Sequence, residues 1–145
     1  MKKYYAVIDT NVLVSALLNR SSTPGEIVRY LLDGTIIPLL HTEIIEEYRD
    51  VLTRPKFGWK RELADEIIGE IEACGIFTEA FSAEDELPDP DDRIFYEVVM
   101  EGRKTEDAYL VTGNIKHFPR KTFVVTPRQM LDIIDDMNDE DLLGC

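Results

Sequence analysis

The sequence alternates short apolar segments with longer amphipathic ones along nearly its whole length. The apolar segments are rich in β-branched and aromatic residues and predict strands, whereas apolar residues at helical spacing predict helices between them. This alternation indicates an α/β fold, in which helices cover both faces of a mainly parallel sheet. The predicted strands cover residues 4–8, 35–40, 76–81, 108–112 and 122–125, and the predicted helices cover residues 10–18, 23–33, 42–53, 61–74, 93–101 and 127–137.

Capping signals mark the ends of several predicted helices. Thr23, Pro24 and Glu26 form a typical helix start, in which Thr23 is the cap and Pro24 takes the first helical position. Gly34 is the expected stop of the same helix.

The chain of 145 residues has the size of one domain, and no repeat or long linker divides it. We therefore predict a single domain over residues 1–137, followed by an acidic tail at residues 138–145. No apolar run reaches the about 18 residues of a membrane helix, so we expect a cytoplasmic protein that does not enter a membrane.

Acidic residues outnumber basic ones by 29 to 16, which gives a formal net charge of −13. Two segments that contain no base account for the whole excess: residues 79–92 hold seven acids and residues 130–145 hold six. This charge argues against a protein that binds nucleic acid by broad neutralisation of phosphates. A protein that handles nucleic acid through bound cations remains compatible with it, because a cation reverses the charge that the phosphates meet.

Side chains typical of a zinc site or a disulfide scaffold are few. Cys74 and Cys145 are far apart in the sequence and have no metal-ligand spacing. His41 and His117 are isolated, so we expect them to have polar surface or capping roles.

The pattern places three acidic side chains where they could meet. Asp9 ends the first strand, and the carboxyl ends of strands line the ligand crevice of an open parallel sheet. At about 100° per residue, Glu46 faces water, whereas Glu47 lies at the border of the apolar face of its helix. Asp92 lies at the edge of the next apolar arc, and Asp91 could also point inward.

Each of these carboxylates also has a purely structural interpretation. Asp9 could cap the helix that follows it, and the acids around Glu47 could form a solvated helix face. The acids of residues 89–92 could serve only the dipole of the helix that begins there. Asn114 follows the fourth strand as a polar tip, and Gly113-Asn114 also suits a plain turn.

Three carboxylates that converged on one crevice would repel one another unless cations were present. Mg²⁺ and Mn²⁺ prefer oxygen ligands and keep several waters for substrate phosphates. Such an ion lowers the pKa of a bound water, orients it for attack and offsets charge in the transition state. The chemistry indicated is hydrolysis of a phosphodiester or a phosphate ester.

Four segments, in order, resemble the PIN domain family, and within it the VapC-like branch of toxin components of toxin–antitoxin systems. The resemblance covers residues 4 to about 130. The segments are VIDTNVLVSA at residues 7–16, EEYRDVLTRPKF at 46–57, DPDD at 89–92 and LVTGNIKHFP at 110–119.

The resemblance implies a three-layer α/β/α fold with a five-stranded parallel sheet in the order 3-2-1-4-5. It also implies a Mg²⁺- or Mn²⁺-dependent ribonuclease site at the carboxyl ends of the strands. Asp9, Glu47 and Asp92 match the metal-binding acids of the family, and Asn114 falls where many members carry a fourth, catalytic Asp. Because an amide removes one charge from the site, we expect one firmly held ion, with any second ion arriving with the substrate.

Further matches concern residues around the acids. Asn11 and Thr112 occupy polar positions that brace the acids in the family. Two basic stretches could grip single-stranded RNA or could be ordinary helix ends and loops. The denser one contains Arg49, Arg54, Lys56, Lys60 and Arg61 with Phe57 and Trp59, and the smaller one contains Lys116, Arg120 and Lys121.

The leading prediction is therefore an endoribonuclease that acts as the toxin of a toxin–antitoxin pair, with RNA as substrate, a cognate antitoxin protein as partner and a homodimer as the assembly. One alternative is a catalytically weak PIN-like module that binds RNA or protein. Another is a haloacid-dehalogenase-like phosphatase, whose starting motif resembles Asp9-Thr10-Asn11-Val12 but requires a second Asp in place of Asn11. We expect the acidic tail to be mobile and to solubilise the protein or contact a basic partner.

Overall fold

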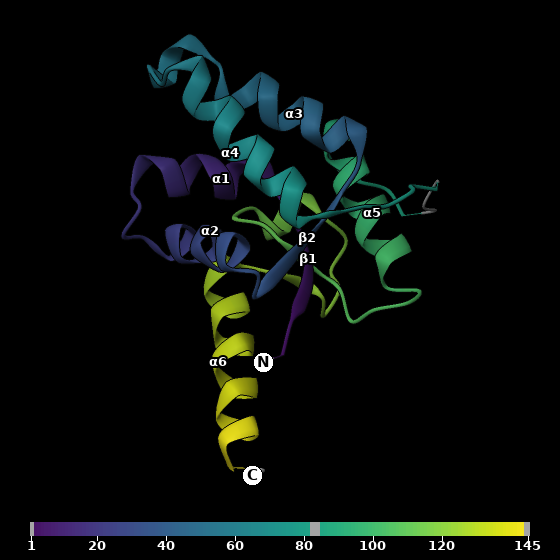
Figure 1. The fold of residues 1–145 in the computed structure, drawn as a ribbon. Helices are drawn as coiled ribbons and strands as arrows, with labels where there is room; N and C mark the ends of the chain where they lie inside the picture. The colour runs from purple at the N-terminus through teal and green to yellow at the C-terminus, as the bar shows by residue number, and fades with distance from the viewer. Residues whose placement is uncertain (1, 82–84, 144–145) are drawn as a thin grey trace.

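All five predicted strands form and join one parallel sheet in the order β3-β2-β1-β4-β5, which confirms the predicted order. The computed structural model, shown in Figure 1, describes residues 2–81 and 85–143, with side chains up to residue 136. The strands are β1 (Tyr4–Ile8), β2 (Ile36–Leu40), β3 (Ile76–Phe77), β4 (Tyr109–Val111) and β5 (Val124–Val125).

Helices connect the strands, as the alternating pattern predicted. No helix in the described part of the chain has the length and apolar character needed to cross a membrane. The α-helices are α1 (Thr10–Leu18), α2 (Thr23–Asp33), α3 (Thr42–Leu52), α4 (Arg61–Cys74), α5 (Arg93–Gly102) and α6 (Pro127–Leu143), and the short 3-10 helices are η1 (Pro55–Phe57), η2 (Pro90–Asp92) and η3 (Ile115–His117).

Two consecutive residues of β2 show how the helices cover the two faces of the sheet. Successive side chains of a strand point to opposite faces. Leu39 lies so close to Gly102, at the end of α5, that a Cβ atom there would collide with it, and Leu40 lies equally close to Gly75, just after α4. Helices α5 and α4 therefore pack on opposite faces, which gives the three-layer α/β/α arrangement.

The core lies between these layers and explains why the sheet is apolar throughout. Four of the five residues of β1 and four of the five residues of β2 are buried. A strand buried on both faces reads as a nearly continuous apolar run, as it does in parallel sheets generally. Strand β1 lies between β2 and β4, so its carboxyl end lies in the middle of one edge of the sheet.

The predicted end of β3 and the predicted cap of α2 are wrong. Strand β3 stops at Phe77 because β2 ends at Leu40, whose carbonyl already accepts a hydrogen bond from the Thr78 amide at 2.7 Å. The cap of α2 is Ser22, whose side chain accepts a hydrogen bond from the Gly25 amide at 3.2 Å. Thr23, the expected cap, is instead the first residue of the helix.

The chain end also differs from the prediction. Helix α6 does not stop at residue 137 but continues to Leu143, through most of the segment expected to be a mobile tail. Figure 1 shows this helix projecting from the rest of the molecule. Gly34 does end α2, with a φ of 89° that favours glycine.

Candidate metal and nucleic-acid site

Asp9 stands at the carboxyl end of β1, and only 6% of its surface is exposed. Although it precedes α1, its side chain makes no capping hydrogen bond to that helix. Its Oδ2 instead accepts a hydrogen bond from the Thr112 hydroxyl at 2.7 Å. The capping interpretation therefore does not account for this buried carboxylate.

Thr112 follows β4 and is completely buried. Its hydroxyl donates to Asp9 and also accepts a hydrogen bond from the Asn114 amide at 2.9 Å. The side chain of Asn11 has a different partner: its Oδ1 accepts a hydrogen bond from the Gly113 amide at 3.2 Å, while its backbone amide helps to lower the pKa of Asp9. The two residues tie the start of α1 to the loop after β4, and in the described hydrogen bonds it is the Thr112 side chain that reaches Asp9.

Glu47 is brought to the same edge of the sheet by its neighbour Tyr48 on α3. Tyr48 is buried, and its hydroxyl donates a hydrogen bond to the backbone carbonyl of Ile8, immediately before Asp9. Glu46 is exposed and Glu47 is half-buried, as the helical spacing predicted. The position of Glu47 is thus confirmed, and its role as a metal ligand stays a prediction.

Asp92 enters from η2, at the start of α5. Its side chain is only 17% exposed, whereas Asp91 is exposed, so Asp92 is the acid of this segment that faces inward. Its Oδ2 is buried and has no hydrogen-bond partner. His117 of η3 lies beside it, with its Nδ1 3.4 Å from that oxygen.

The carboxylates at this edge influence one another electrostatically. Burial, reinforced by the charges of Asp9 and Asp89, raises the pKa of Asp92 to about 6, although His117 opposes the shift. Burial also raises the pKa of Asp9, against the hydrogen bond from Thr112.

Glu47 experiences the same neighbours. Burial raises its pKa, and the charges of Asp50, Asp91 and Asp9 add to the shift, against the opposing effect of Arg54. The charge of Asp9 therefore influences both of the other predicted metal ligands, Glu47 and Asp92.

Asn114 occupies a more peripheral place than the acids. It is exposed and precedes η3, so it lies on the loop that also presents His117. Its backbone amide contacts Thr112. Asn114 is thus linked to Asp9 through one intervening hydroxyl.

The donor set has the chemistry that Mg²⁺ and Mn²⁺ prefer, because its ligands are carboxylate oxygens. The buried Asp92 oxygen without a partner and the three raised carboxyl pKa values are what a bound cation would relieve. In the arrangement described, however, no three acidic, histidine or cysteine side chains of residues 2–81 and 85–136 are close enough to form a ready-made metal cluster. Mg²⁺ commonly keeps several water ligands and needs only one or two protein carboxylates. The residues therefore fit an ion that retains part of its hydration shell.

Sequence reasoning missed three residues that shape this site. The predictions did not include Tyr48 as a residue of the site, and they did not foresee that His117, although exposed as expected, also reaches Asp92. Asp85, in the acidic segment, accepts a hydrogen bond from the Tyr96 hydroxyl at 2.8 Å and thereby fastens that segment to α5. A buried tyrosine usually seeks a partner for its hydroxyl, which is the one signal that could have drawn attention to Tyr48 and Tyr96.

The other histidine has the predicted capping role. His41 caps α3, where its Nδ1 accepts a hydrogen bond from the Glu43 amide at 3.1 Å.

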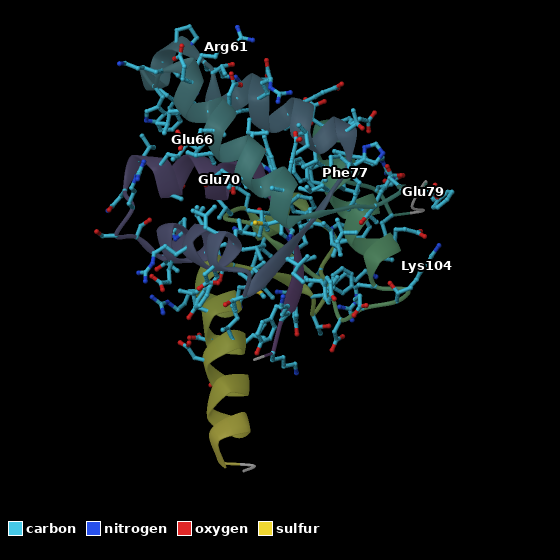
Figure 2. All side chains as sticks on the ribbon, viewed as in Figure 1. Arg61, Glu66, Glu70, Phe77, Glu79 and Lys104 are labelled. Carbon is cyan, nitrogen blue, oxygen red and sulfur yellow. The ribbon has the colours of Figure 1, made fainter. Side chains whose placement is uncertain are left out.

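Two pockets help to judge where a ligand would bind. One of about 400 Å³ borders the acidic edge and includes Glu47, Asp91 and Arg93 in its lining. A larger one of about 560 Å³ lies between α1, α2 and α4, and Glu66 and Glu70 in Figure 2 stand beside it. The larger pocket is lined by none of the four candidate residues, so we assign the site from the carboxylates rather than from pocket size.

Comparison with known proteins identifies a family. A family model described as the PIN domain matches residues 5–116, which include all four candidate site residues. No curated protein matches the chain. The family match favours the nuclease interpretation over the phosphatase alternative.

Proposed function

Because the chain belongs to the PIN domain family, whose members are typically nucleases that use divalent metal ions, we propose that it is a Mg²⁺- or Mn²⁺-dependent endoribonuclease. It would hydrolyse phosphodiester bonds of RNA. The observation that carries the proposal is the pair of inward-facing carboxylates, Asp9 and Asp92, whose charges influence each other and one of which has a buried oxygen without a hydrogen-bond partner.

Each residue has a distinct task in this proposal. Asp9 and Asp92 would hold the ion, and Glu47 would hold it directly or through a bound water. The chemistry that such an ion would supply, when bound by these residues, is activation of a water and compensation of the charge that develops on the phosphate. The Thr112 hydroxyl fixes the rotamer of Asp9 by its 2.7 Å hydrogen bond.

Asn114 and His117 lie at the rim of this arrangement. The exposed amide of Asn114 can orient a water or a substrate oxygen without adding negative charge. His117 contacts the Asp92 oxygen and offsets part of the acidic repulsion when it is protonated.

The first prediction tests the acids with matched variants. Asp9→Asn should abolish Mn²⁺-dependent cleavage of a single-stranded RNA, because it removes a charged ligand from the centre of the site. Glu47→Gln should lower the cleavage rate by roughly 10- to 100-fold, whereas Glu46→Gln, on the same helix but exposed, should leave it unchanged. Cleavage by Asp9→Asn at the wild-type rate would overturn the proposal.

We also propose that the nuclease is the toxin of a toxin–antitoxin pair, with a cognate antitoxin as its partner and a homodimer as its assembly. The likeness of residues 7–16 and 110–119 to the VapC-like branch supports this role. Expression of the chain alone should arrest growth, and co-expression of a small protein encoded by an adjacent gene should relieve the arrest. Size-exclusion chromatography with light scattering reports the assembly, and growth that is unaffected by the chain alone would contradict the toxin role.

A second candidate function has one observation in its favour. The described side chains form no ready-made cluster of three metal ligands, and Asn114 replaces a charged residue, so a catalytically weak RNA- or protein-binding module is the alternative. Titration calorimetry separates the two functions. Binding of Mn²⁺ that is lost in Asp92→Asn favours the nuclease, and no heat of binding at millimolar Mn²⁺ favours the module.

A further inference from the structure

The turn between α3 and α4 is strongly basic in an otherwise acidic chain. We call residues 53–61 the hairpin tip, which contains η1 and the first residue of α4. Figure 2 shows Arg61 at this end of the two helices. The surrounding residues 51–61 include no acid, and their bases are Arg54, Lys56, Lys60 and Arg61.

Three of these cations are available to an anion from outside. Arg54 is already paired with Asp50 at 3.1 Å. Lys56, Lys60 and Arg61 are exposed, and none of them forms an ion pair with the part of the chain that the structure describes. The tip therefore concentrates three unused positive charges on a molecule whose net charge is −13.

An aromatic pair holds the tip in a defined shape. The rings of Phe57 and Trp59 stack with their centroids 4.7 Å apart and their planes 12° apart. Gly58 between them has a φ of 68°, a conformation that favours glycine and brings the two rings together. Trp59 also packs against the hydrophobic core. Because the aromatic pair already holds the tip in shape, binding of a ligand would cost little conformational entropy of the tip.

The chemistry of the tip fits single-stranded RNA better than an acidic protein surface. Cations beside aromatic rings are the usual combination for binding a single strand, since phosphates meet the charges and unstacked bases meet the rings. The Lys56 ammonium lies 5.1 Å from the centroid of the Phe57 ring, a place that a base can take when the ammonium turns to a phosphate. An acidic peptide would use the charges but not the rings.

The tip is also connected to the proposed catalytic edge through a single helix. Glu47 lies on α3, and the tip begins directly after that helix: Thr53, its C-cap, follows Glu47 by six residues, about 9 Å along the helix axis. A strand bound at the tip could thus continue along α3 to the carboxylates. The acids would repel such a strand, and the tip supplies the attraction that they lack.

We propose that the hairpin tip is the anchoring site for single-stranded RNA, which Lys56, Lys60 and Arg61 hold through its phosphates while the Phe57–Trp59 pair offers a surface for a base. This inference rests on the proposed ribonuclease function for the identity of the ligand. It adds a binding site outside the carboxylate edge.

The protein carries its own probe for this site, because Trp59 is its only tryptophan. The experiment adds a 12-nucleotide oligouridylate to the full chain carrying Asp9→Asn, in EDTA, so that no cleavage occurs. RNA bound at the tip should change the tryptophan fluorescence in a saturable way. A second titration, with a fluorescently labelled copy of the same RNA, gives the affinity independently of Trp59.

The decisive comparison uses two triple variants with the same net charge. Replacing Lys56, Lys60 and Arg61 by Gln should weaken binding at least tenfold and reduce the slope of log affinity against log salt by about 2, since each phosphate contact on a single strand contributes roughly 0.7. Replacing the exposed Lys2, Lys3 and Lys104 by Gln should change the affinity by less than twofold. It should change the slope of log affinity against log salt by no more than the roughly 0.7 that one phosphate contact contributes. A thermal melt of each variant verifies that it is folded.

The outcomes also separate this inference from the proposed function. If the unmodified chain cleaves RNA but the tip variant binds it normally, the anchoring site is wrong and the nuclease stands. If RNA binds at the tip but Mn²⁺ supports no cleavage, the anchoring site stands and the nuclease is wrong. A competition with poly-glutamate tests the acidic-protein alternative. If poly-glutamate displaces the RNA, changes the Trp59 fluorescence and binds more tightly than the RNA, the ligand is an acidic protein and the inference is overturned.

Discussion

The single hydroxyl of Thr112 orients the carboxylate at the centre of the site. Replacing Thr112 by Val keeps the shape of the side chain but removes the donor to Asp9 and the acceptor for the Asn114 amide. Without that hydrogen bond the pKa of Asp9 rises further, so the acidic limb of the pH–rate profile should move to higher pH and the rate at neutral pH should fall roughly tenfold.

The conservative variant serves as the control for this prediction. Thr112→Ser retains the hydroxyl and should restore most of the rate and the original pH profile. A Val variant with reduced activity but an unshifted profile would show that Thr112 acts through packing alone.

The raised pKa of Asp92 links the site to stability. The folded state raises this pKa from its usual 3.8 to about 6, so between these values the native protein holds a proton that the unfolded chain has released. The contribution of Asp92 to the free energy of unfolding is therefore lost as the pH rises from about 4 to 6. Without metal, Asp92→Asn should stabilise the protein at pH 7.5 by of the order of 1 kcal/mol, a value reduced by solvent screening of the partly exposed group.

Urea unfolding at two pH values tests this effect. At pH 7.5 the midpoint of Asp92→Asn should exceed that of the wild type, and at pH 4 the difference should vanish. Addition of Mn²⁺ should reverse the order at pH 7.5, because only the wild type gains a full set of ligands. Equal midpoints throughout would contradict the assignment of a strained carboxylate at this position.

At the scale of elements, one buried hydrogen bond positions α3 on the sheet. Tyr48→Phe removes the donor to the Ile8 carbonyl and should lower the free energy of unfolding by about 1–2 kcal/mol. The ring centroids of Tyr48 and Phe95 are 6.3 Å apart, and the phenyl ring of the variant would keep this contact, so the fold should persist. Denaturant unfolding measures the loss, and Tyr30→Phe, on partly exposed α2, should show little of it.

The elements also show which features local patterns can predict. Helical spacing alone separated half-buried Glu47 from exposed Glu46, because burial of a helix face follows from its own sequence. Asp9 was found for a similar reason, since a polar residue directly after an apolar strand lies at the edge of a sheet.

Features that depend on a partner distant in the sequence could not be predicted in this way. The length of β3 is set by where β2 ends, and the position of His117 becomes meaningful only when η3 meets Asp92. The cap of α2 was missed for a different, local reason. Ser22 and Thr23 are equally good caps in sequence, and the backbone geometry at this point makes Ser22 the cap. The order of the sheet was available only through the family resemblance, because alternation of strands and helices permits several parallel orders.

At the scale of the whole molecule, charge is sorted by region. Helix α6 and the segment before α5 lie apart from the hairpin tip (Figure 1), so the net charge of −13 is not spread evenly over the molecule. A net charge averaged over the sequence therefore says little about the affinity of one small cationic region for nucleic acid.

The end of α6 allows a test at this scale. Up to residue 136, where the described side chains of this helix end, the buried ones include Met130, Leu131 and Ile134, so we expect deletion of residues 138–145 to leave the melting temperature and RNA cleavage unchanged. Solubility, or affinity for a basic partner, should fall because three acids are lost. Ile134→Ala is the contrasting variant and should cost about 2–5 kcal/mol. A deletion as destabilising as Ile134→Ala would show that the end of the helix contributes to the fold.

The hydrogen bond between Thr112 and Asp9 joins residues that are 103 positions apart in the chain. During synthesis Asp9 emerges from the ribosome well before Thr112, the residue that accounts for its side-chain hydrogen bond. A growing chain therefore carries Asp9, Glu47 and Asp92 before β4 can join the sheet beside β1. If the chain cuts RNA as proposed, its own messenger meets a complete site only after this part of the chain has emerged.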